Sequence, residues 1–448
     1  MLKYSAMYTI GPTKKIEAKI TLPPDKSISH RAIFFSSLSS RRTKIYPFLA
    51  SNDIQATLNC VKKLGIKYYQ DKSSKEAIYL QGKGLYFPNN QNVDLFAGDS
   101  GTTIRILSGL LVGQKFSSTF NAGNYLDKRP MGRVVYPLAE MGANIDGRKI
   151  AKPGGQEIYP PLKIKPVSEL IGKSYKLDIA SAQVKSALLL AGLYAQGETI
   201  VEEPYQSRDH TERMLKSFGA NIKIDKNTIT LKPGAQLNLP EEIFIPADFS
   251  AAAFFIVLGL ILKNSQITIK NVNLNPTRYG LLRVLQRMNA NITIENQNNQ
   301  LEPYGDIIVR SSYLRATRVE PKEIPAMIDE VPILCVAASF ASGQTQIKGL
   351  DELRIKETDR VDSMLSNLSK SGVDIVDKDS HQDGCQITIK GGTKYKGADF
   401  SSFGDHRTAM SLAIFALAAE GESKIDDIKC IDKSFPGFIK IVEEITRQ

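Results

Sequence analysis

The chain has 448 residues, of which 42% are hydrophobic and 23% are charged, and its formal net charge is +11 at pH 7. This length allows more than one domain, and the composition is ordinary for a globular protein. The four cysteines form no C-x-x-C pair, which argues against a disulfide framework and against a zinc site. They are Cys60, Cys335, Cys385 and Cys430.

The N-terminal segment alternates like a strand and lacks the continuous apolar core of a secretory signal. The apolar run Ala251–Leu262 is shorter than the roughly 20 residues that cross a bilayer. We therefore expect a cytoplasmic protein that makes no membrane contact.

The positive net charge favours anionic partners, but its distribution argues against nucleic acid. Lys and Arg are scattered along the chain, and no aromatic-rich basic motif or zinc finger is present. We expect small anions as ligands.

A repeated helix pattern runs along the chain. Several segments begin with small or polar residues, continue as apolar stretches and often end near Gly. They are residues 26–38, 100–113, 181–197, 248–261, 329–343 and 405–421. Their starts recur about every 70 to 80 residues, which suits a two-helix α/β module better than a solenoid repeat.

Each apolar helix is followed by a second helix with amphipathic spacing, and most of these run directly into a β-like segment. The second helices are predicted at residues 52–65, 133–142, 210–219, 278–289, 357–372 and 434–445. The pattern predicts an α/β fold of six βαβαββ units in two similar domains. Because a helix that is apolar all round must be covered on every side, we expect these helices inside each domain.

Polar clusters occupy the starts of the apolar helices. Asp25–Ala32 (DKSISHRA) opens the first, and Gly98–Arg105 (GDSGTTIR) opens the second. A helix start has unpaired backbone N–H groups and a partial positive charge, so such clusters suit anions. If the helices of both domains point towards a common cleft, an anionic ligand would draw the domains together. For each segment alone, the alternative is a capped helix start with ordinary surface charges.

Candidate acid/base groups lie at three further helix starts. Asp329 opens an apolar helix, and Arg354–Arg360 (RIKETDR) is predicted to open an amphipathic one. Helical spacing would place Arg360 near Glu357, a carboxylate kept ionised by flanking cations. His406, at the start of the last apolar helix, titrates near neutral pH. Charge-paired helix capping is the alternative for these groups.

Further polar groups could bind an anion or cap a helix. Arg129, in LDKRPM, offers a bidentate clamp for a carboxylate or phosphate. Ser181–Ser186 (SAQVKS) supplies hydroxyl, amide and ammonium groups, while Ser207–Glu212 (SRDHTE) and Asp248 fit N-caps.

Taken together and in order, these motifs closely resemble the 5-enolpyruvylshikimate-3-phosphate synthase family of enolpyruvyl transferases. The resemblance covers nearly the whole chain. Its motifs are PPDKSISHRA, GDSGTTIR, DKRPM, SAQVKSALLLAGL, SRDHTE, NPTR, RIKETDR, DHR and KSFPGF. The SAQVKSALLLAGL and RDHTE versions are similar to the second of the family's two sequence classes.

The resemblance implies an inside-out α/β barrel fold in two domains, each with three βαβαββ units. Residues 1–24 would form a first strand of the C-terminal domain, 247–448, which would carry the acid/base and phosphoenolpyruvate residues. Residues 25–246 would form the N-terminal domain, which would bind mainly shikimate 3-phosphate. No metal or organic cofactor is implied, and we expect a monomer.

The implied reaction transfers the enolpyruvyl group of phosphoenolpyruvate to the 5-hydroxyl of shikimate 3-phosphate and releases phosphate. It would proceed by addition and elimination in the interdomain cleft, on the chorismate pathway of aromatic amino acid biosynthesis. Adding a hydroxyl to an enol phosphate requires protonation of the methylene and removal of the hydroxyl proton, so two acid/base groups are chemically reasonable.

The resemblance also implies residue roles. Asp329 would take the 5-hydroxyl proton and Glu357 would exchange the methylene proton. Lys356 and His406 would assist electrostatically or by proton relay. Shikimate 3-phosphate would be bound by Lys26, Ser27, Arg31, Ser181, Ala182, Gln183, Arg208, Asp329 and Lys356. Phosphoenolpyruvate would be bound by Lys26, Gly101, Arg129, Gln183, Arg360, Arg407 and Lys433.

Two positions depart from the family pattern. Asp99 stands where Asn is common, and its carboxylate would repel an anion unless it is paired or turned away. Glu352 stands where the first class has Asn, so no substrate contact is assigned to it.

Two other functions remain open. The related UDP-N-acetylglucosamine enolpyruvyl transferases usually show KN where this chain has Lys26-Ser27, and they carry a reactive loop cysteine that no cysteine here matches. A basic protein that merely retains the fold would bind DNA or RNA in a salt-sensitive manner without turnover.

Overall fold

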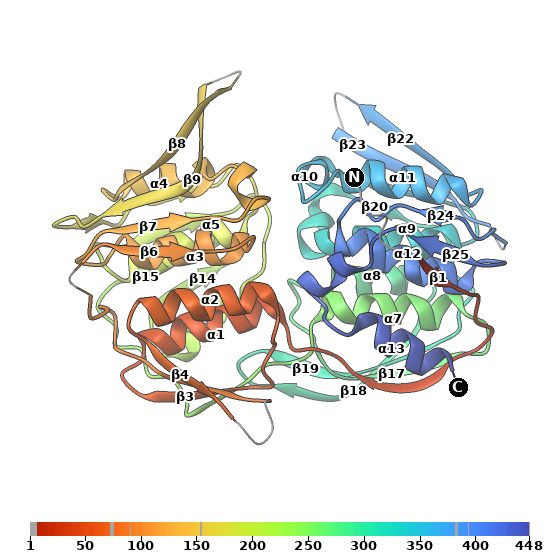
Figure 1. Cartoon of the computed structure of the whole chain (residues 1–448), viewed down its shortest axis with the longest axis horizontal. Helices are drawn as coiled ribbons and strands as arrows, with labels where there is room; N and C mark the ends of the chain where they lie inside the picture. The colour runs from red at the N-terminus through yellow and green to blue at the C-terminus, as the bar shows by residue number, and fades with distance from the viewer. Residues whose placement is uncertain are drawn as a thin grey trace. The chain divides into compact units, whose positions relative to one another are not determined.

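The computed structural model describes residues 7–71, 76–89, 91–152, 155–380, 384–392 and 394–447, without the side chains of 378–380. The predicted first strand covered residues 1–24, and its residues 1–6 lie outside the described part of the chain. The chain divides into two compact units. The N-terminal unit is Pro24–Ile245, and the C-terminal unit combines Met1–Pro23 with Pro246–Gln448. Figure 1 labels the elements of each unit.

The N-terminal unit alternates helices and strands. Its helices are α1 (Lys26–Leu38), α2 (Asn52–Lys63), α3 (Gly101–Leu111), the 3-10 turn η1 (Leu126–Lys128), α4 (Gly132–Glu140), α5 (Ala182–Gly192) and α6 (His210–Ser217). Its strands are β3 (Arg42–Tyr46), β4 (Lys67–Gln70), β5 (Ile78–Gln81), β6 (Val93–Phe96), β7 (Ser118–Asn121), β8 (Asn144–Lys152), β9 (Gly155–Lys165), β10 (Leu170–Ile171), β11 (Ser174–Lys176), β12 (Ala195–Gln196), β13 (Thr199–Glu202), β14 (Asn221–Asp225), β15 (Thr228–Lys232) and β16 (Glu242–Phe244).

The C-terminal unit alternates in the same way. Its helices are α7 (Phe249–Ile261), α8 (Gly280–Arg287), η2 (Pro321–Ala326), η3 (Ile328–Glu330), α9 (Val331–Ser339), α10 (Asp351–Arg354), α11 (Arg360–Lys370), α12 (His406–Ala418), η4 (Lys429–Lys433) and α13 (Phe438–Thr446). Its strands are β1 (Tyr8–Ile10), β2 (Glu17–Thr21), β17 (Gln266–Asn273), β18 (Asn291–Asn299), β19 (Pro303–Arg310), β20 (Arg318–Val319), β21 (Gln344–Lys348), β22 (Asp374–Ser380), β23 (Gly384–Lys390), β24 (Asp399–Phe400) and β25 (Ser423–Ile425).

The four-stranded sheets share one topology. In β6-β7-β9-β8, the pair β6–β7 is parallel, and the antiparallel hairpin β8–β9 joins through β9. The sheets β11-β13-β15-β14 and β20-β21-β23-β22 repeat this order. In β16-β3-β5-β4 and β18-β19-β17-β2, the parallel partner comes from a distant part of the chain: β16 pairs with β3, and β2 pairs with β17. The predicted βαβαββ unit is confirmed in these sheets.

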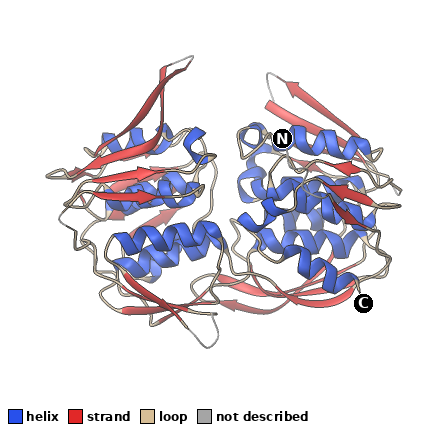
Figure 2. Cartoon of the chain, viewed as in Figure 1, coloured by secondary structure: helices blue, strands red, loops and turns tan. Residues whose placement is uncertain are grey.

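The apolar helices lie inside each unit, as predicted. In α7, every residue from Phe249 to Leu260 is buried. Helices α7, α9 and α12 pack against one another, and α3 packs against α1 and α5. Figure 2 shows sheets around the helices of each unit. Burial of each large apolar side chain stabilises the fold by about 1.5 to 3 kcal/mol, so these helices form the core of each unit.

The outer helices α2, α4, α6, α8 and α11 are each followed, directly after the C-cap, by a residue with positive φ. Gly65, Gly142, Gly219 and Gly372 follow the C-caps of α2, α4, α6 and α11 with φ between 87° and 92°, and Asn289 follows α8 with φ 68°. Gly adopts this left-handed conformation without a Cβ penalty. The turn then directs the chain into β4, β8, β14, β18 or β22.

Three sequence-based predictions are corrected. The single N-terminal strand is two strands in different sheets, because β1 pairs with β25 and β2 with β17. The sixth unit has no hairpin after α13 in the described residues, and β1 completes the sheet β1-β25-β24 instead. The helix predicted at residues 357–372 spans Arg360–Lys370, because the Asp359 side chain caps it by accepting from the backbone N–H groups of Val361 and Asp362.

Candidate active site

In the C-terminal unit, three carboxylates converge on the guanidinium of Arg360. Its Nη2 donates to Glu357 Oε2 at 2.8 Å, and its Nη1 donates to Asp329 Oδ1 at 3.2 Å. Its Nε donates to Asp405 Oδ2 at 3.1 Å. The Arg360 and Asp405 side chains are buried, whereas 21% of the Asp329 side chain and 37% of the Glu357 side chain are exposed. The two candidate acid/base groups are therefore the accessible members of the cluster.

The start of α12 adjoins this cluster. Asp405 Oδ1 accepts from the backbone N–H groups of Arg407 and Thr408, so Asp405 both caps α12 and holds Arg360. The Arg407 side chain is buried, and within the described residues its Nε has no hydrogen-bond partner. Lys433 Nζ donates to the carbonyl of Gly404 at 3.4 Å. A helix N-terminus with two nearby cations suits an anion.

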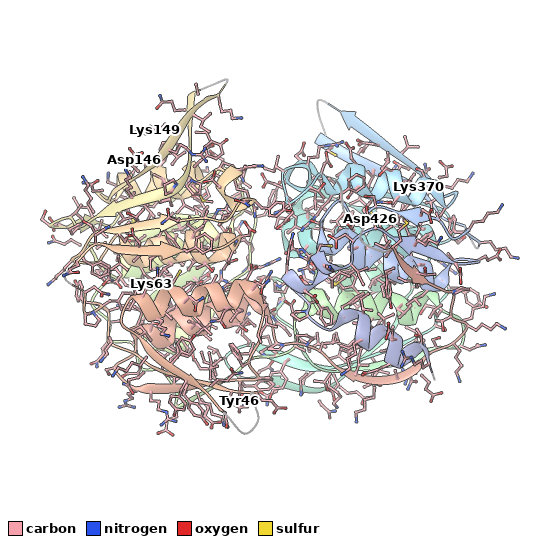
Figure 3. The ribbon with its side chains drawn as sticks, in the orientation of Figure 1. Tyr46, Lys63, Asp146, Lys149, Lys370 and Asp426 are labelled. Atoms are coloured by element: carbon pink, nitrogen blue, oxygen red, sulfur yellow. The ribbon has the colours of Figure 1, made fainter. Side chains whose placement is uncertain are left out.

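The loop before α12 is held by hydrogen bonds to Asp426, the residue that follows β25. Asp426, labelled in Figure 3, accepts from Ser401 Oγ at 2.6 Å and from the Ser402 backbone N–H at 2.8 Å. Burial would raise the pKa of Asp426, but the hydrogen bonds from Ser401 and Ser402 hold it below its usual value. These two hydrogen bonds fix the loop that carries Asp405 against the segment that follows β25.

Lys356 lies in the bend between α10 and α11, beside the Arg360 cluster. Burial lowers the pKa of Lys356, Arg360 lowers it further, and the charges of Asp329 and Glu357 partly oppose the shift. The side chain is thus electrostatically coupled to both candidate acid/base groups.

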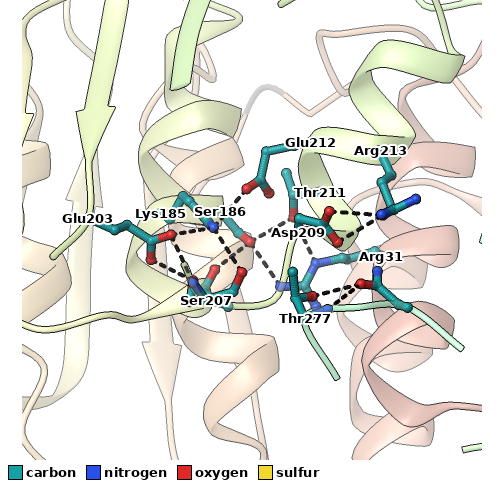
Figure 4. Close-up of polar contacts among 12 residues, drawn as sticks. Arg31, Lys185, Ser186, Glu203, Ser207, Asp209, Thr211, Glu212, Arg213 and Thr277 are labelled. Atoms are coloured by element: carbon teal, nitrogen blue, oxygen red, sulfur yellow. Dashed lines mark hydrogen bonds and ion pairs between the residues drawn. The ribbon is translucent and has the colours of Figure 1, made fainter. Parts of the chain in front are cut away.

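In the N-terminal unit, the start of α1 is tied to α5 and α6 (Figure 4). Arg31 Nε donates to Thr211 Oγ1 at 2.7 Å, and its Nη2 donates to Ser186 Oγ at 2.9 Å. Arg208 Nη1 donates to Ser27 Oγ at 3.3 Å. The predicted residues Ser27, Arg31 and Arg208 therefore lie together.

Lys26 lies at the same helix start and is ion-paired. Its Nζ is 3.0 Å from Asp53 Oδ2 on α2, and both side chains are partly exposed. Two other polar residues of this motif are structural. Ser29 Oγ donates to the Asp25 carbonyl, and His30 is buried with Nδ1 2.7 Å from Thr57 Oγ1.

A second group of predicted residues lies where α3 meets α5. Ser181 caps α5, which places Ala182 and Gln183 in its first turn. Gln183 Nε2 donates to Thr102 Oγ1 at 3.1 Å, while Arg105 Nη1 donates to Gln183 Oε1 at 2.8 Å.

Gly101 provides the space beside these groups. A Cβ there would lie 2.8 Å from Arg105 Nη1 and 3.5 Å from Arg129 Nη1. The first distance is shorter than real Cβ contacts, so a side chain at this position would displace Arg105. Gly101 and Arg129 are therefore neighbours in the N-terminal unit.

Asp99 is turned towards the loop that carries Arg129. Its Oδ1 accepts from the backbone N–H groups of Tyr125 and Leu126, at 3.0 Å and 3.1 Å. These bonds hold the start of η1, three residues before Arg129. Although Asp99 stands where Asn is common, its carboxylate oxygen still provides the acceptor that holds the loop.

The described residues contain no group of three or more His, Cys, Asp or Glu side chains that could hold a metal ion. Among the described helices, none has both the length and the apolar character that a bilayer crossing requires.

Comparison with known proteins decides the family. The family model for EPSP synthase (3-phosphoshikimate 1-carboxyvinyltransferase) matches residues 10–442. The chain belongs to the EPSP synthase family. The 3-phosphoshikimate 1-carboxyvinyltransferase of Geobacter sp. (strain M21) is 45% identical over 442 residues, covering 98% of this chain and 99% of the relative. That of Thermodesulfovibrio yellowstonii is 46% identical over 441 residues, with 98% and 99% coverage.

Solved structures confirm the fold expected for the EPSP synthase family. The EPSP synthase structure from Acinetobacter baumannii at 2.37 Å matches with a TM-score of 0.85 and 37% identity, covering 98% of both chains. The enolpyruvyl transferase NikO from Streptomyces tendae matches with a TM-score of 0.73 and 14% identity, covering 98% of this chain and 97% of that one, which supports the fold alone. The substrates of this family are small anionic molecules.

Within the EPSP synthase family framework, sequence reasoning left several supporting residues unassigned. Arg105 holds Gln183, Asp53 pairs with Lys26, and Asp405 holds Arg360. Arg105 and Asp405 lie inside the GDSGTTIR and DHR motifs, so their position in these motifs could have indicated a role in the site. Asp53 gave no such signal, since its partner lies 27 residues away.

Proposed function

We propose that this chain transfers the enolpyruvyl group of phosphoenolpyruvate to the 5-hydroxyl of shikimate 3-phosphate and releases phosphate, a step of aromatic amino acid biosynthesis. The reaction is an addition followed by an elimination. Membership of the EPSP synthase family supports this assignment. It requires no metal or organic cofactor.

Asp329 and Glu357 are proposed as the two acid/base groups. In the addition, the 5-hydroxyl oxygen bonds to C2 of phosphoenolpyruvate, its proton passes to Asp329, and Glu357 protonates the methylene carbon. In the elimination, that carbon returns a proton to Glu357. The C2–O bond to phosphate breaks, and phosphate leaves with the electron pair and the proton held by Asp329.

Glu357 must carry a proton during the addition, whereas its contact with Arg360 favours the ionised carboxylate. We therefore propose that the anionic substrate takes over this guanidinium when it binds. Lys356 and His406 assist by their charge or by proton relay, and the lowered pKa of Lys356 suits exchange with a neighbouring carboxylate.

The proposed binding residues form one set for each substrate. Shikimate 3-phosphate engages Lys26, Ser27, Arg31, Ser181, Ala182, Gln183, Arg208, Asp329 and Lys356. Phosphoenolpyruvate engages Lys26, Gly101, Arg129, Gln183, Arg360, Arg407 and Lys433. The guanidinium and ammonium groups in these sets suit carboxylate and phosphate recognition.

The observation that carries the proposal is the pairing of Asp329 and Glu357 through the buried Arg360 side chain. Two partly exposed carboxylates beside an anion-binding cation provide both proton transfers and charge stabilisation at one place. A purely structural ion pair would not need a second carboxylate left accessible.

We also propose that the protein works in the cytoplasm as a monomer and binds no nucleic acid. Its cysteines Cys60, Cys335, Cys385 and Cys430 are free and buried. Burial raises the pKa of the Cys335 thiol to about 12, which suits a structural rather than a reactive cysteine. Size-exclusion chromatography with light scattering tests the monomer, and salt-dependent DNA and RNA binding tests the last point.

A phosphate-release assay tests the function. Purified protein with phosphoenolpyruvate should release phosphate when shikimate 3-phosphate is added, and it should release none with UDP-N-acetylglucosamine. The opposite preference would overturn the substrate assignment. Turnover with neither acceptor would overturn the proposed function.

A further inference from the structure

A buried charged triad lies behind the start of α5. Lys185 Nζ is 2.6 Å from Glu203 Oε2 and 2.7 Å from Glu212 Oε1 (Figure 4). The exposed fractions of the three side chains are 1%, 0% and 2%. Lys185 comes from α5, Glu203 follows β13, and Glu212 belongs to α6. None of the roles proposed above uses these residues.

A buried charged triad of this kind is not expected to stabilise the fold by itself. Removing three charges from water is unfavourable, and replacing a buried ion pair with apolar side chains is often neutral or stabilising. The two carboxylates also exceed the single ammonium group. Burial accordingly raises the pKa of Glu212, and Lys185 only partly opposes the shift. The arrangement therefore calls for a role in positioning other groups.

On one side, the triad holds the segment that presents Arg208. Glu203 accepts from the Ser207 backbone N–H at 3.2 Å and from Ser207 Oγ at 2.5 Å. Lys185 Nζ donates to the Ser207 carbonyl at 3.5 Å. Both peptide groups of Ser207 are thus held, and the next residue, Arg208, reaches Ser27 on α1.

On the other side, the triad joins α5 to α6 beside Arg31. Ser186 follows Lys185, and Thr211 precedes Glu212. Ser186 Oγ and Thr211 Oγ1 are 2.7 Å apart, and Arg31 donates to both. Each of these two hydroxyls therefore lies one residue from a charge of the triad.

We infer that Lys185, Glu203 and Glu212 are positioning residues that set the geometry of Arg31 and Arg208 for binding shikimate 3-phosphate. The triad touches no substrate itself; it fixes the hydroxyl and backbone groups on which these two arginines depend. Hydrogen bonds weaken steeply when their geometry is disturbed, so small shifts of the triad should weaken the binding of this anion by the two arginines. This inference rests on the proposed function.

The test compares variants of the full chain by steady-state kinetics and by direct binding of shikimate 3-phosphate in calorimetry. Lys185→Met is expected to raise the KM and Kd for shikimate 3-phosphate about tenfold or more. The kcat and the KM for phosphoenolpyruvate should stay within about twofold. The matched control is Lys149→Met, which removes the same charge from the exposed Asp146–Lys149 pair of the same unit (Figure 3) and should change none of these values.

A second variant separates positioning from folding. In Lys185→Met/Glu203→Leu/Glu212→Leu all three buried charges are removed, so the protein should fold with a higher Tm than Lys185→Met, which leaves two buried carboxylates without a cation. It should still lose affinity for shikimate 3-phosphate, because Leu cannot hold Ser207. An unchanged KM and Kd in this folded variant would overturn the inference.

If the triple variant fails to fold, Ser207→Ala tests the positioning role instead. It removes only the hydroxyl contact to Glu203 and should raise the KM for shikimate 3-phosphate about threefold. No change would overturn the inference. Absence of turnover in the unmodified chain would instead overturn the proposed function, and the inference with it.

Discussion

Arg360 and Asp405 form a buried ion pair, with Nε 3.1 Å from Oδ2, that joins the first residue of α11 to the N-cap of α12. The same aspartate caps α12 through Oδ1. Orientation of the Arg360 guanidinium, and with it the placement of Asp329 and Glu357, therefore depends on the start of a neighbouring helix.

Asp405→Asn tests this dependence. The amide oxygen of Asn can still cap α12, but its NH2 group cannot accept from Arg360. We expect stability to fall by about 2 kcal/mol, because a buried cation loses one of its partners. The KM for phosphoenolpyruvate should rise by about tenfold. Urea unfolding and kinetics measure both effects, and the exposed Asp94→Asn serves as control. Wild-type values in both assays would contradict the coupling.

Glu357→Gln and Asp329→Ala test the proposed proton transfers. Each removes one acid/base group and should lower kcat by about 10² to 10⁴, the usual range for general acid–base catalysis. Both side chains are partly exposed, so the folded structure should persist, as judged by circular dichroism and Tm. Near-normal rates in both variants would remove their catalytic roles.

Local sequence patterns predicted much of the fold because the responsible interactions are local. Apolar periodicity marked the inner helices, and the left-handed C′ residues Gly65, Gly142, Gly219 and Gly372 marked the ends of the outer ones. The separate sheets of β1 and β2 were missed, since their partners β25 and β17 lie far along the chain and the N-terminal alternation shows no break.

For the candidate site, the sequence predicted the motif residues but not the contacts that support them. The motifs marked Asp329, Glu357 and Arg360, whose contacts the structure shows within one unit. The start of α11 was misplaced, because Asp359 outcompetes the earlier polar residues as N-cap by accepting two backbone N–H groups. The supporting contacts of Arg105 and Lys185 join residues of different elements, which no local pattern reveals.

Asp99→Ala tests the bracing of the Arg129 loop. Losing the acceptor for the Tyr125 and Leu126 N–H groups should loosen η1 and raise the KM for phosphoenolpyruvate about fivefold. Asp99→Asn is the matched control, because its amide oxygen can accept the same bonds. If the loop requires the acceptor and not the charge, Asn should behave like the native residue. Equal loss in both variants would contradict this account.

Lys356→Met should separate activity from stability. Because burial lowers the folded pKa of Lys356 below its unfolded value, its charge destabilises the fold at pH values below the folded pKa, and this penalty is relieved as the pH rises through it. We expect an equal or higher Tm at pH 7 with kcat/KM lowered about tenfold or more. Lys370→Met, at an exposed position of α11, is the control (Figure 3). A lower Tm with unchanged kinetics would contradict the proposed role.

His30 should make the protein sensitive to mild acid. Burial lowers the pKa of His30 to about 3, so between that value and about 6.5 the unfolded chain binds a proton that the folded chain does not. Stability therefore falls as the pH drops through this window, by at most about 1.4 kcal/mol per pH unit from this group. In His30→Asn, the loss between pH 6 and pH 5, measured by urea unfolding, should be about 1 kcal/mol smaller than in the native chain. Phe34→Leu, which alters the ring stacked on His30 and removes no titrating group, should keep the native pH dependence. Parallel pH profiles for His30→Asn and the native protein would show that His30 takes up its proton equally well in the folded chain.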